Sequence, residues 1–330
     1  MFELVTVQAN TFRCLFEVLT NILTDINMQV DKNGLRISAT DSSHVSLVYV
    51  LIRGDKLESF KCTRPHTIGL NIPTLHKVLK TAKNTDTLTL RLLDTNMDEL
   101  QVEMSNTERQ THSAWGVKLL DLDDESLVMP DLESKRTVTM SSAEFQEIMK
   151  DFASFHDSVR IVVDGGRITF GCDGDAVSCE KTLQNTAPPP KAKKAATKTK
   201  KAQKPQKKAK KLKKCAFIDD EAEDEDGEED EEEEEEEPEE EPEEEAEGSG
   251  DDLVGPGRIP IRIQGGSGGT YSAEFAIKFL SLFAKAAYLS NAVHIFVHDS
   301  DFPIIFKYII ASMGELRMCL APKIHDVDVQ

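Results

Sequence analysis

The tetrapeptide Ser-Ala-Glu-Phe occurs at residues 142–145 and again at residues 272–275 of the 330-residue chain. Each copy begins a segment in which apolar side chains recur every three or four residues, as on one face of a helix. Two more such segments begin at Phe12 and Leu75. Once the charged stretch 187–256 is set aside, the two pairs of segments have nearly the same separation. The spacing predicts one helix–strands–helix–strands unit used twice, with an insertion in the second copy.

Four helices are expected from this periodicity. Their apolar positions are Phe12, Leu15, Phe16, Leu19 and Leu23; Leu75, Val78, Leu79 and Ala82; Phe145, Ile148, Met149 and Phe152; and Phe275, Phe279, Leu282, Phe283 and Ala286. Ser141 and Glu144 have the spacing of a capping box at the start of the third helix.

Between the helices, short runs of alternating apolar and polar residues predict β-strands. Such runs are Val45–Ile52, Leu88–Leu92, Leu100–Met104, Val159–Val163, Val293–Val297 and Ile304–Ile310. Asp164, Gly165 and Gly166 are a turn signal directly after one of them. Because helices are too few to follow every strand, the sheets are expected to be mostly antiparallel and the fold class α+β.

Charge divides the chain into two kinds of sequence. Residues 187–256 carry 13 lysines and then 26 acidic residues, a composition that cannot form an apolar core. The rest of the chain carries 26 basic and 33 acidic side chains, a net charge of −7 out of −20 for the whole chain. A mildly acidic folded part has to contact nucleic acid through local basic surfaces.

Cysteine usage and hydropathy indicate an intracellular, soluble protein. No Cys-x-x-Cys pair occurs, which is typical of reduced thiols. The opening residues lack the charged-then-apolar order of a signal peptide, and no apolar run approaches the roughly 18 residues of a membrane span. The cysteines are Cys14, Cys62, Cys172, Cys179, Cys215 and Cys319.

Residues 119–135 join the two units. Acidic side chains fill most of residues 121–125, yet residues 127–130 form the apolar cluster Leu-Val-Met-Pro. Apolar clusters are unusual in linkers because they stand in water. This cluster is therefore expected to lie on a surface or to bind a partner.

Three motifs in this order point to a family. They are Asp41-Ser42-Ser43-His44-Val45-Ser46-Leu47, Leu119-Leu120-Asp121-Leu122-Asp123 and Leu320-Ala321-Pro322-Lys323-Ile324, and the opening Met1-Phe2-Glu3 and the Met313-Gly314 turn agree with them. In these segments the chain resembles the proliferating cell nuclear antigen family, the DNA sliding clamps of eukaryotes and archaea. The resemblance covers essentially all residues outside the insertion.

The resemblance implies a DNA-clamp fold of class α+β. Two similar domains, each with two helices packed on antiparallel sheets, would form a subunit, and three subunits would close head to tail into a ring with the helices lining the hole. The implied N-terminal domain is 1–118, the connector 119–135, and the C-terminal domain 136–186 and 257–330. The 187–256 insertion is expected to be disordered; a solvated tether, a nuclear-localisation signal within residues 207–214 and an auxiliary binding segment remain open.

The implied function is that of a non-enzymatic processivity factor that encircles double-stranded DNA. Sliding requires weak, sequence-independent contacts to phosphates, which basic side chains on the lining helices provide. An ordinary solvated helix face is the alternative interpretation of these side chains. The expected DNA contacts are Arg13, Lys77, Lys80, Lys83, Arg109, Lys150, Lys278 and Lys285.

Four positions depart from the family pattern. Cys14, Thr20 and Glu147 stand where the family usually has basic residues. This predicts a less positive lining, and a hold on DNA that is either more salt-sensitive or more dependent on partners. Gly165 stands where a lysine usually carries a ubiquitin-type modification, so this regulation is expected to be missing or moved.

For its partners, the family uses a hydrophobic pocket beneath the connector, which accepts the aliphatic and aromatic anchors of a peptide. For the leucines at 47, 127 and 320, which match this pocket, a place in the core is the alternative interpretation. Cys319 stands beside the pocket, where the family commonly has an aromatic residue. The matching residues are His44, Val45, Leu47, Leu127, Val128, Met129, Pro130, Pro303, Leu320, Ala321, Pro322 and Ile324. Ring closure is implied to pair the edge strands Arg109–Val117 and Asp175–Leu183 of neighbouring subunits.

The implied partners are double-stranded DNA, a DNA polymerase, other proteins with clamp-binding peptides, and a clamp loader. The implied location is the nucleus, or the site of DNA replication if the protein is viral. Two non-enzymatic alternatives are a monomeric clamp relative that binds DNA through a basic face and a subunit of a heteromeric ring.

No cofactor, metal or catalytic residue is expected. Residues 265–269 fit the nucleophile motif Gly-x-Ser-x-Gly, with Asp299 or Asp301 and His325 after it. However, the nucleophile elbow requires a parallel sheet with βαβ units, and glycine at four of five positions favours a flexible turn.

Overall fold

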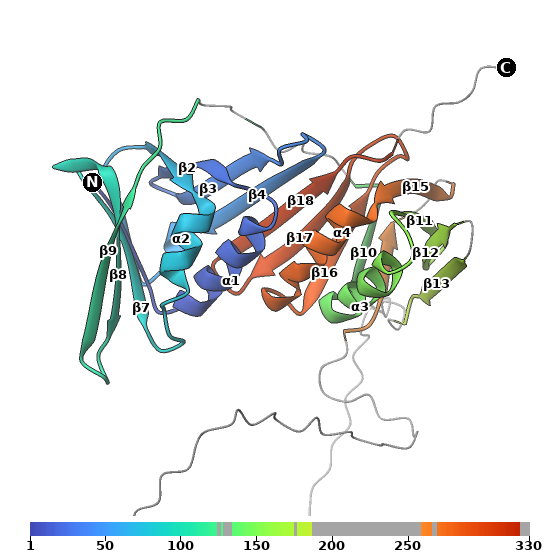
Figure 1. Ribbon diagram of the computed structural model, residues 1–330. Coiled ribbons are helices and arrows are strands. Elements are labelled where there is room, and N and C mark those ends of the chain that lie inside the picture. Colours follow the sequence, from blue (N-terminus) through green and yellow to red (C-terminus); the bar gives the residue numbers. More distant parts are fainter. Residues whose placement is uncertain (124–126, 128–133, 175–176, 187–258, 266–268, 324–330) are drawn as a thin grey trace, which may run out of the picture. The chain divides into compact units, whose positions relative to one another are not determined.

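The computed structural model describes residues 1–123, 127, 134–174, 177–186, 259–265 and 269–323 (Figure 1). The expected insertion and much of the expected connector lie outside these residues. In the part of the chain that is described, no helix combines the length and apolar character needed to cross a membrane.

Within the described residues, four α-helices form where the apolar periodicity predicts them. They are α1 (Ala9–Thr20), α2 (Ile72–Leu79), α3 (Ser142–Ala153) and α4 (Ile277–Ala284), and the 3-10 turn η2 (Lys285–Tyr288) continues α4. Each helix buries one apolar stripe; in α1 this stripe contains Phe12, Leu15, Phe16 and Leu19. Such a stripe holds a short helix on a sheet more effectively than helix propensity does.

The two Ser-Ala-Glu-Phe copies have different structures. Residues 142–145 begin α3, whereas residues 272–275 lie in strand β15 (Tyr271–Ala276), where alternate side chains are buried. The prediction that Phe275 is a helix residue was therefore wrong. The buried residues of α4 are Ile277, Leu280, Phe283 and Ala284.

The Ser141 half of the expected capping box at α3 is not formed. Ser141 precedes the helix, but its side chain makes no capping hydrogen bond. Helix α2 has a side-chain cap instead, because Asn71 Oδ1 accepts a hydrogen bond of 3.0 Å from the Thr74 N–H. Pro73 stands in the first turn of α2. A backbone N–H at this position has no acceptor within the helix, so proline costs no hydrogen bond there.

The strands between the helices pair antiparallel, which confirms the expected α+β class. Those not yet given are β1 (Phe2–Thr6), β2 (Asp25–Asp31), β3 (Gly34–Thr40), β4 (Ser46–Arg53), β5 (Ser59–Cys62), β6 (His66–Asn71), β7 (Thr87–Leu93), β8 (Asn96–Asn106), β9 (Thr111–Lys118), β10 (Arg136–Ser141), β11 (Ser158–Asp164), β12 (Arg167–Asp173), β13 (Ser178–Gln184), β14 (Arg262–Gly265), β16 (Ala292–Val297), β17 (Ile304–Ile310) and β18 (Gly314–Leu320). A 3-10 turn, η1 (Gly54–Lys56), follows β4.

In the described residues these strands form three sheets. One has the order β5-β1-β7-β8-β9, a second β13-β12-β11-β15, and a nine-stranded sheet has the order β14-β10-β16-β17-β18-β4-β3-β2-β6. The nine-stranded sheet takes strands from both halves of the chain. The halves join where β18 pairs with β4, from Gly314 opposite Ile52 to Leu320 opposite Ser46.

The strand orders contain a repeated unit. The order from β5 to β9 in the first half matches the order from β14 to β18 in the second, and β6-β2-β3-β4 matches β15-β11-β12-β13. Within each half the two helices pack on each other, α1 on α2 and α3 on α4. The duplication that the helix spacing predicts is thus visible in the sheets.

The helices lie together on one side of the nine-stranded sheet (Figure 1). Phe145 of α3 and Phe283 of α4 pack on Phe306 of β17, with ring centroids 5.2 and 5.7 Å apart. The buried apolar residues form one cluster that runs through both halves. Burial of this cluster is the main stabilising term, and it leaves the opposite faces of the helices to solvent.

Candidate functional site

Basic side chains gather on the solvent side of the helices. Lysines 77, 80, 83, 150, 278 and 285 are exposed on or just after α2, α3 and α4, Arg13 is half-buried on α1, and Arg109 is exposed before β9. None of the eight forms an ion pair with another described residue. Their charges therefore remain available to an external anion.

The end of α2 concentrates positive charge. Lys77 lies in its last turn and Lys80 is its C-cap, where the partial negative charge of the helix end stabilises cations. Burial, and then the charge of Lys80, lowers the pKa of His76. The histidine is therefore neutral at pH 7, and the two lysines carry the charge of this turn.

Lys83 and Arg109 are positioned by one buried carboxylate and one amide. The Lys83 N–H donates to Asp86 Oδ2 at 2.8 Å, Asn106 Nδ2 donates to Asp86 Oδ1 at 3.1 Å, and the Arg109 N–H donates to Asn106 Oδ1 at 3.0 Å. Burial raises the pKa of Asp86, but these hydrogen bonds outweigh it and leave the pKa below its usual value. The ionised carboxylate fixes both backbones and leaves the two cationic side chains free.

The two halves also meet on the helical side. Lys285 Nζ donates a hydrogen bond of 2.6 Å to Asn21 Oδ1 at the end of α1. Tyr288, in the same turn as Lys285, is 78% exposed and lines a hollow of about 330 Å³ with Cys14 and Glu17. Neither Asn21 nor Tyr288 was identified from the sequence as a residue of the site. One signal could have pointed to Tyr288, namely its position three residues after Lys285.

Three of the four departures from the family pattern lie on this face. Burial raises the pKa of the Cys14 thiol, which is therefore neutral. The Thr20 hydroxyl donates to the Phe16 carbonyl at 2.7 Å. Glu147 is exposed and lines a hollow together with Lys150 and Lys285. A carboxylate in the same hollow as two lysines lowers the positive potential at this point.

Strands β9 and β13 are the outermost strands of their sheets, in the segments expected to form subunit edges. Residues 175 and 176 lie outside the described residues, and β13 begins at Ser178. Every β9 side chain except Val117 is exposed, including that of Trp115, which is 44% exposed. Trp115 lies on the same face as buried Val117, so an apolar ring stands at an open sheet edge.

One carboxylate organises the loop between β3 and β4. Asp41 accepts hydrogen bonds from the N–H groups of Ser43, Val45 and Ser46 at 2.9, 3.0 and 2.6 Å, and from both serine hydroxyls. Burial raises the pKa of Asp41, but these bonds outweigh it and lower the pKa to about 2. The loop presents His44, at a φ of 55°, and Val45 to solvent.

A hollow of about 650 Å³ has Pro303, Ala321 and Pro322 in its wall. The Ala321 N–H donates to the Val45 carbonyl at 3.2 Å, which ties the loop to the end of β18. On the other side the Lys323 N–H donates to the Glu274 carbonyl at 2.7 Å. The structure thus brings together residues that are far apart in the sequence, among them Val45, Pro303, Ala321 and Pro322 of the predicted partner site.

The described residues of the connector contact β6, β2 and β3. Leu120 bridges Gly69, where a Cβ atom would collide with the Leu120 carbonyl. Asn27 Nδ2 donates to the Asp123 carbonyl at 2.9 Å, and Ser38 Oγ donates to the Leu127 carbonyl at 2.8 Å. These contacts hold Leu127 on the same sheet as the loop that carries His44.

Not every expected partner residue is available at the surface. Leu320 is fully buried, which corrects its assignment to the partner site: its side chain packs in the core. Leu47 and Leu127 are half-buried. Four expected residues lie outside the described part of the chain, namely Val128, Met129, Pro130 and Ile324.

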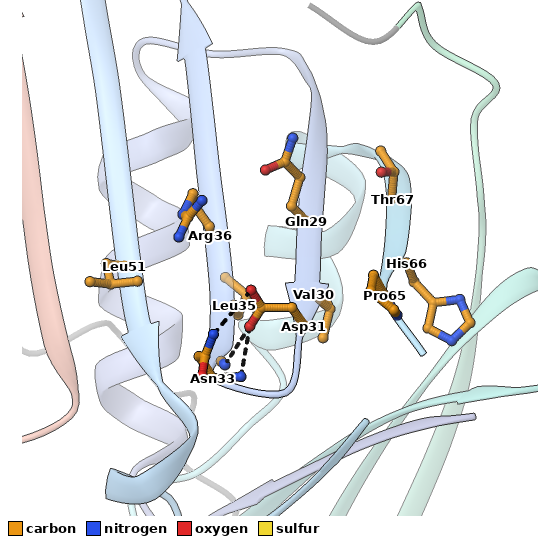
Figure 2. Close-up of a pocket in the computed structure, with 11 residues that line it drawn as sticks. Gln29, Val30, Asp31, Asn33, Leu35, Arg36, Leu51, Pro65, His66 and Thr67 are labelled. Atoms are coloured by element: carbon orange, nitrogen blue, oxygen red, sulfur yellow. Dashed lines mark hydrogen bonds between the residues drawn. The ribbon is translucent and has the colours of Figure 1, made fainter. Parts of the chain in front are cut away.

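A separate hollow of about 300 Å³ lies on β4, β3, β2 and β6, with Leu51, Arg36, Gln29 and Thr67 among its lining residues (Figure 2). It adjoins the β2–β3 turn, where Asp31 Oδ1 accepts hydrogen bonds from two turn N–H groups. None of the expected site residues lines it.

The serine and the histidine of the hydrolase motif lie outside the described residues, which exclude residues 266–268 and His325. Asp299 is engaged by Lys135, whose Nζ lies 2.6 Å from Asp299 Oδ1. No group of three or more His, Cys, Asp and Glu side chains among the described residues is placed to hold a metal ion.

A duplicated α+β unit, a sheet shared between the halves, basic helices on one side and an open edge strand in each half define a DNA-clamp subunit. The family model described as proliferating cell nuclear antigen, N-terminal domain, matches residues 1–126, and the model of the C-terminal domain matches residues 128–207 and 268–323. The chain belongs to the proliferating cell nuclear antigen family. It is similar to the probable DNA polymerase sliding clamp 1 of Paramecium bursaria Chlorella virus 1, with 24% identity over 325 residues, 98% of this chain and 97% of that relative.

Proposed function

We propose that this protein is a sliding clamp: three copies close into a ring around double-stranded DNA and hold a DNA polymerase on it. The observation that carries this proposal is the joint between β18 and β4. The duplication makes β9 the counterpart of β18, and β13 the counterpart of β4. The antiparallel pairing that joins the two halves of one chain can therefore recur between β9 of one subunit and β13 of the next.

The register of this joint follows from the duplication. Val293 of β16 lies as far along the chain from Ile277, the start of α4, as Leu88 of β7 lies from Ile72, the start of α2. In the first half, the strand pairs lead from β7 through β8 to Trp115 of β9. In the second half, they lead from β16 through β17 to Met318 of β18. Trp115 is therefore the counterpart of Met318.

The same comparison applies to the second edge. Val48 pairs with Ala39 of β3, and Cys179 pairs with Cys172 of β12. Ala39 and Cys172 stand at the same position in their strands, counted from the first residue of each. Because Met318 lies opposite Val48 within the chain, Trp115 is expected opposite Cys179 of the neighbouring subunit. The exposed indole would then be covered.

The cations on the helical side suit DNA that is held without base readout. They form no ion pair with another described residue and are spread over all four helices, so they attract phosphates by counterion release and give no sequence preference. Arg13, Lys77, Lys80, Lys83, Arg109, Lys150, Lys278 and Lys285 are the proposed contacts.

The hollow beside Ala321 is the proposed docking site for polymerase and other clamp-binding peptides. Its wall is partly apolar, and the Asp41 loop contacts it through the hydrogen bond from the Ala321 N–H to the Val45 carbonyl. A clamp loader that opens the ring belongs to the same proposal, as does a location in the nucleus or at a viral replication site. The chain itself is proposed to act without catalysis or a cofactor.

The test is the solution mass, measured by light scattering after gel filtration at low micromolar concentration and moderate salt. The expected result is three times the 36.7 kDa mass of one chain. A mass of one subunit would overturn the homotrimer and favour a monomeric clamp relative. A ring that forms only with a second chain would identify a heteromeric clamp.

A further inference from the structure

Two cysteines face each other across the outer hairpin of the four-stranded sheet. Cys172 of β12 and Cys179 of β13 are direct cross-strand partners. Directly opposed residues in an antiparallel pair have Cα atoms about 4.5 to 5.5 Å apart, within the range of about 4.4 to 6.8 Å that a disulfide spans. The backbone therefore needs no rearrangement to accept a covalent link.

The two side chains also share one face of the sheet. Cys172 is 3% exposed, and its Sγ donates to the Ser158 carbonyl at 3.1 Å. Cys179 is half-buried on the inward side of β13, within hydrogen-bond reach of Cys172. Both cysteines are free thiols in this structure. In the strand register of the described residues, Cys62 lies opposite Phe2 and Cys319 lies opposite Ile305 and Leu47, while Cys14 lies in α1.

We propose that Cys172 and Cys179 form a reversible cross-strand disulfide in subunits whose β13 edge is uncovered. The oxidant is a peroxide. The Cys179 thiolate attacks one peroxide oxygen, forms a sulfenic acid and releases water after protonation. The Cys172 sulfur then attacks the Cys179 sulfur, loses its proton and expels a second water. Two thiols give up two electrons and two protons, and hydrogen peroxide becomes two waters.

The order of attack follows from the surroundings of the two thiols. Burial, and then the neighbouring Cys179, raises the pKa of Cys172 to about 12, so Cys172 is almost entirely protonated at neutral pH. Cys179 is the more exposed of the two sulfurs and is reached first by a small oxidant. Cys172 is thus the resolving cysteine.

The site lies on the edge that the proposed ring would use, and this part of the inference rests on the proposed function. If Trp115 of the next subunit lies over Cys179, ring closure shields the sulfur that reacts first. An open or dissociated subunit exposes it. Once formed, the disulfide ties β13 to β12 and reduces the freedom of the edge strand.

Peptide mapping tests the disulfide on the full-length Cys215→Ser chain, which removes one competing thiol. To uncover the β13 edge, the chain is first diluted until its solution mass is that of one subunit. It is then exposed to hydrogen peroxide, alkylated and digested with trypsin. Both cysteines fall in the single peptide 168–181, so the disulfide makes this peptide lighter by two hydrogen atoms and leaves it unalkylated. Reduction with dithiothreitol restores two alkylation sites. Alkylation of both cysteines after peroxide treatment, or only over-oxidised Cys179, overturns the proposal.

Three variants keep the two parts separable. Cys179→Ser is expected to abolish the lighter peptide, and Cys14→Ser, which changes a lone half-buried thiol, is expected to leave it unchanged. Trp115→Ala is expected to speed disulfide formation at least several-fold. Suppose that light scattering shows a ring for the parent and smaller species for Trp115→Ala, yet the disulfide forms at equal rates in both. This result would overturn the shielding by Trp115 and leave the disulfide itself standing. A parent that has the mass of one subunit contradicts the proposed ring, while the peptide still decides the disulfide.

Discussion

Lys285 Nζ donates a hydrogen bond of 2.6 Å to Asn21 Oδ1, across the boundary between the two halves of the chain. A proposed DNA contact thus also helps to join the halves on the helical side. The pairing of β18 with β4 joins them through the sheet. Because Lys285 has these two roles, replacing Lys285 and replacing its acceptor Asn21 should have different effects.

Replacing Asn21 by alanine removes the acceptor but keeps the charge. We expect Asn21→Ala to lower the free energy of unfolding by about 0.5 kcal/mol, because the bond is solvent-exposed, with DNA affinity unchanged. Lys285→Ala is expected to lower both. Urea denaturation and DNA binding measured on the same two variants check this. Equal DNA affinity for Lys285→Ala and the parent would assign the lysine to the joint alone.

Loss of the exposed indole should open the ring. An aromatic residue covered at an interface commonly contributes about 2 kcal/mol or more to association, so Trp115→Ala is expected to raise the subunit dissociation constant at least roughly 30-fold. Sedimentation velocity over a dilution series measures it. Phe155→Ala is the control, because Phe155 is 63% exposed and lies in neither β9 nor β13. A parent-like dissociation constant for Trp115→Ala would contradict the proposed register.

The lysines at the end of α2 predict a change in salt dependence. If both contact phosphates, Lys77→Ala with Lys80→Ala should reduce the slope of log affinity against log salt concentration by up to about 1.8, because each contact contributes about 0.9. Affinity for DNA of different sequences should fall uniformly. Binding to a DNA whose ends are blocked, measured over a salt series, gives the slope. Lys32→Ala, in the β2–β3 turn, is the control and should leave it unchanged.

Much of this architecture follows from local sequence, because burial of one face imposes period 3.6 on a helix and period 2 on a strand. Leu88, Leu90 and Leu92 identify β7, and Phe12 to Leu19 identify α1. Ser-Ala-Glu-Phe fails as a guide because four residues do not set their own structure: β15 takes its conformation from pairing with β11. Tertiary context decides such short segments.

The site is less predictable than the fold, for a related reason. Leucines at 47 and 320 look alike in the sequence, yet one is half-buried and the other is fully buried, because opposite faces of a sheet alternate along each strand. The joint between β18 and β4 links positions from opposite ends of the chain, which no local pattern encodes. The contact between Lys285 and Asn21 depends on that joint.

The Asp41 carboxylate makes the loop between β3 and β4 sensitive to acid. Its pKa in the folded protein is lowered from 3.8 to about 2, so its contribution to stability is fully present above pH 3.8 and is lost as the pH falls toward 2. The shift corresponds to roughly 2 kcal/mol at neutral pH. Asp41→Asn should lose about this amount at pH 7 and should flatten the stability profile between pH 4 and 2. Thermal unfolding over that range checks it, and an unchanged profile would show that the loop does not depend on the charge.

Filling the hollow beside Ala321 with a larger side chain should weaken the binding of the proposed peptide ligand. Ala321→Glu places a long charged side chain in the wall, and we expect a fluorescent peptide with one aliphatic and two aromatic anchors to bind at least roughly tenfold more weakly, because its apolar groups would meet a carboxylate. Thr67→Glu, in the separate hollow of Figure 2, is the control. The ring mass should be unchanged in both variants, since neither position lies in β9 or β13. If Thr67→Glu and not Ala321→Glu weakens the peptide, the docking site lies on β2, β3 and β6 instead.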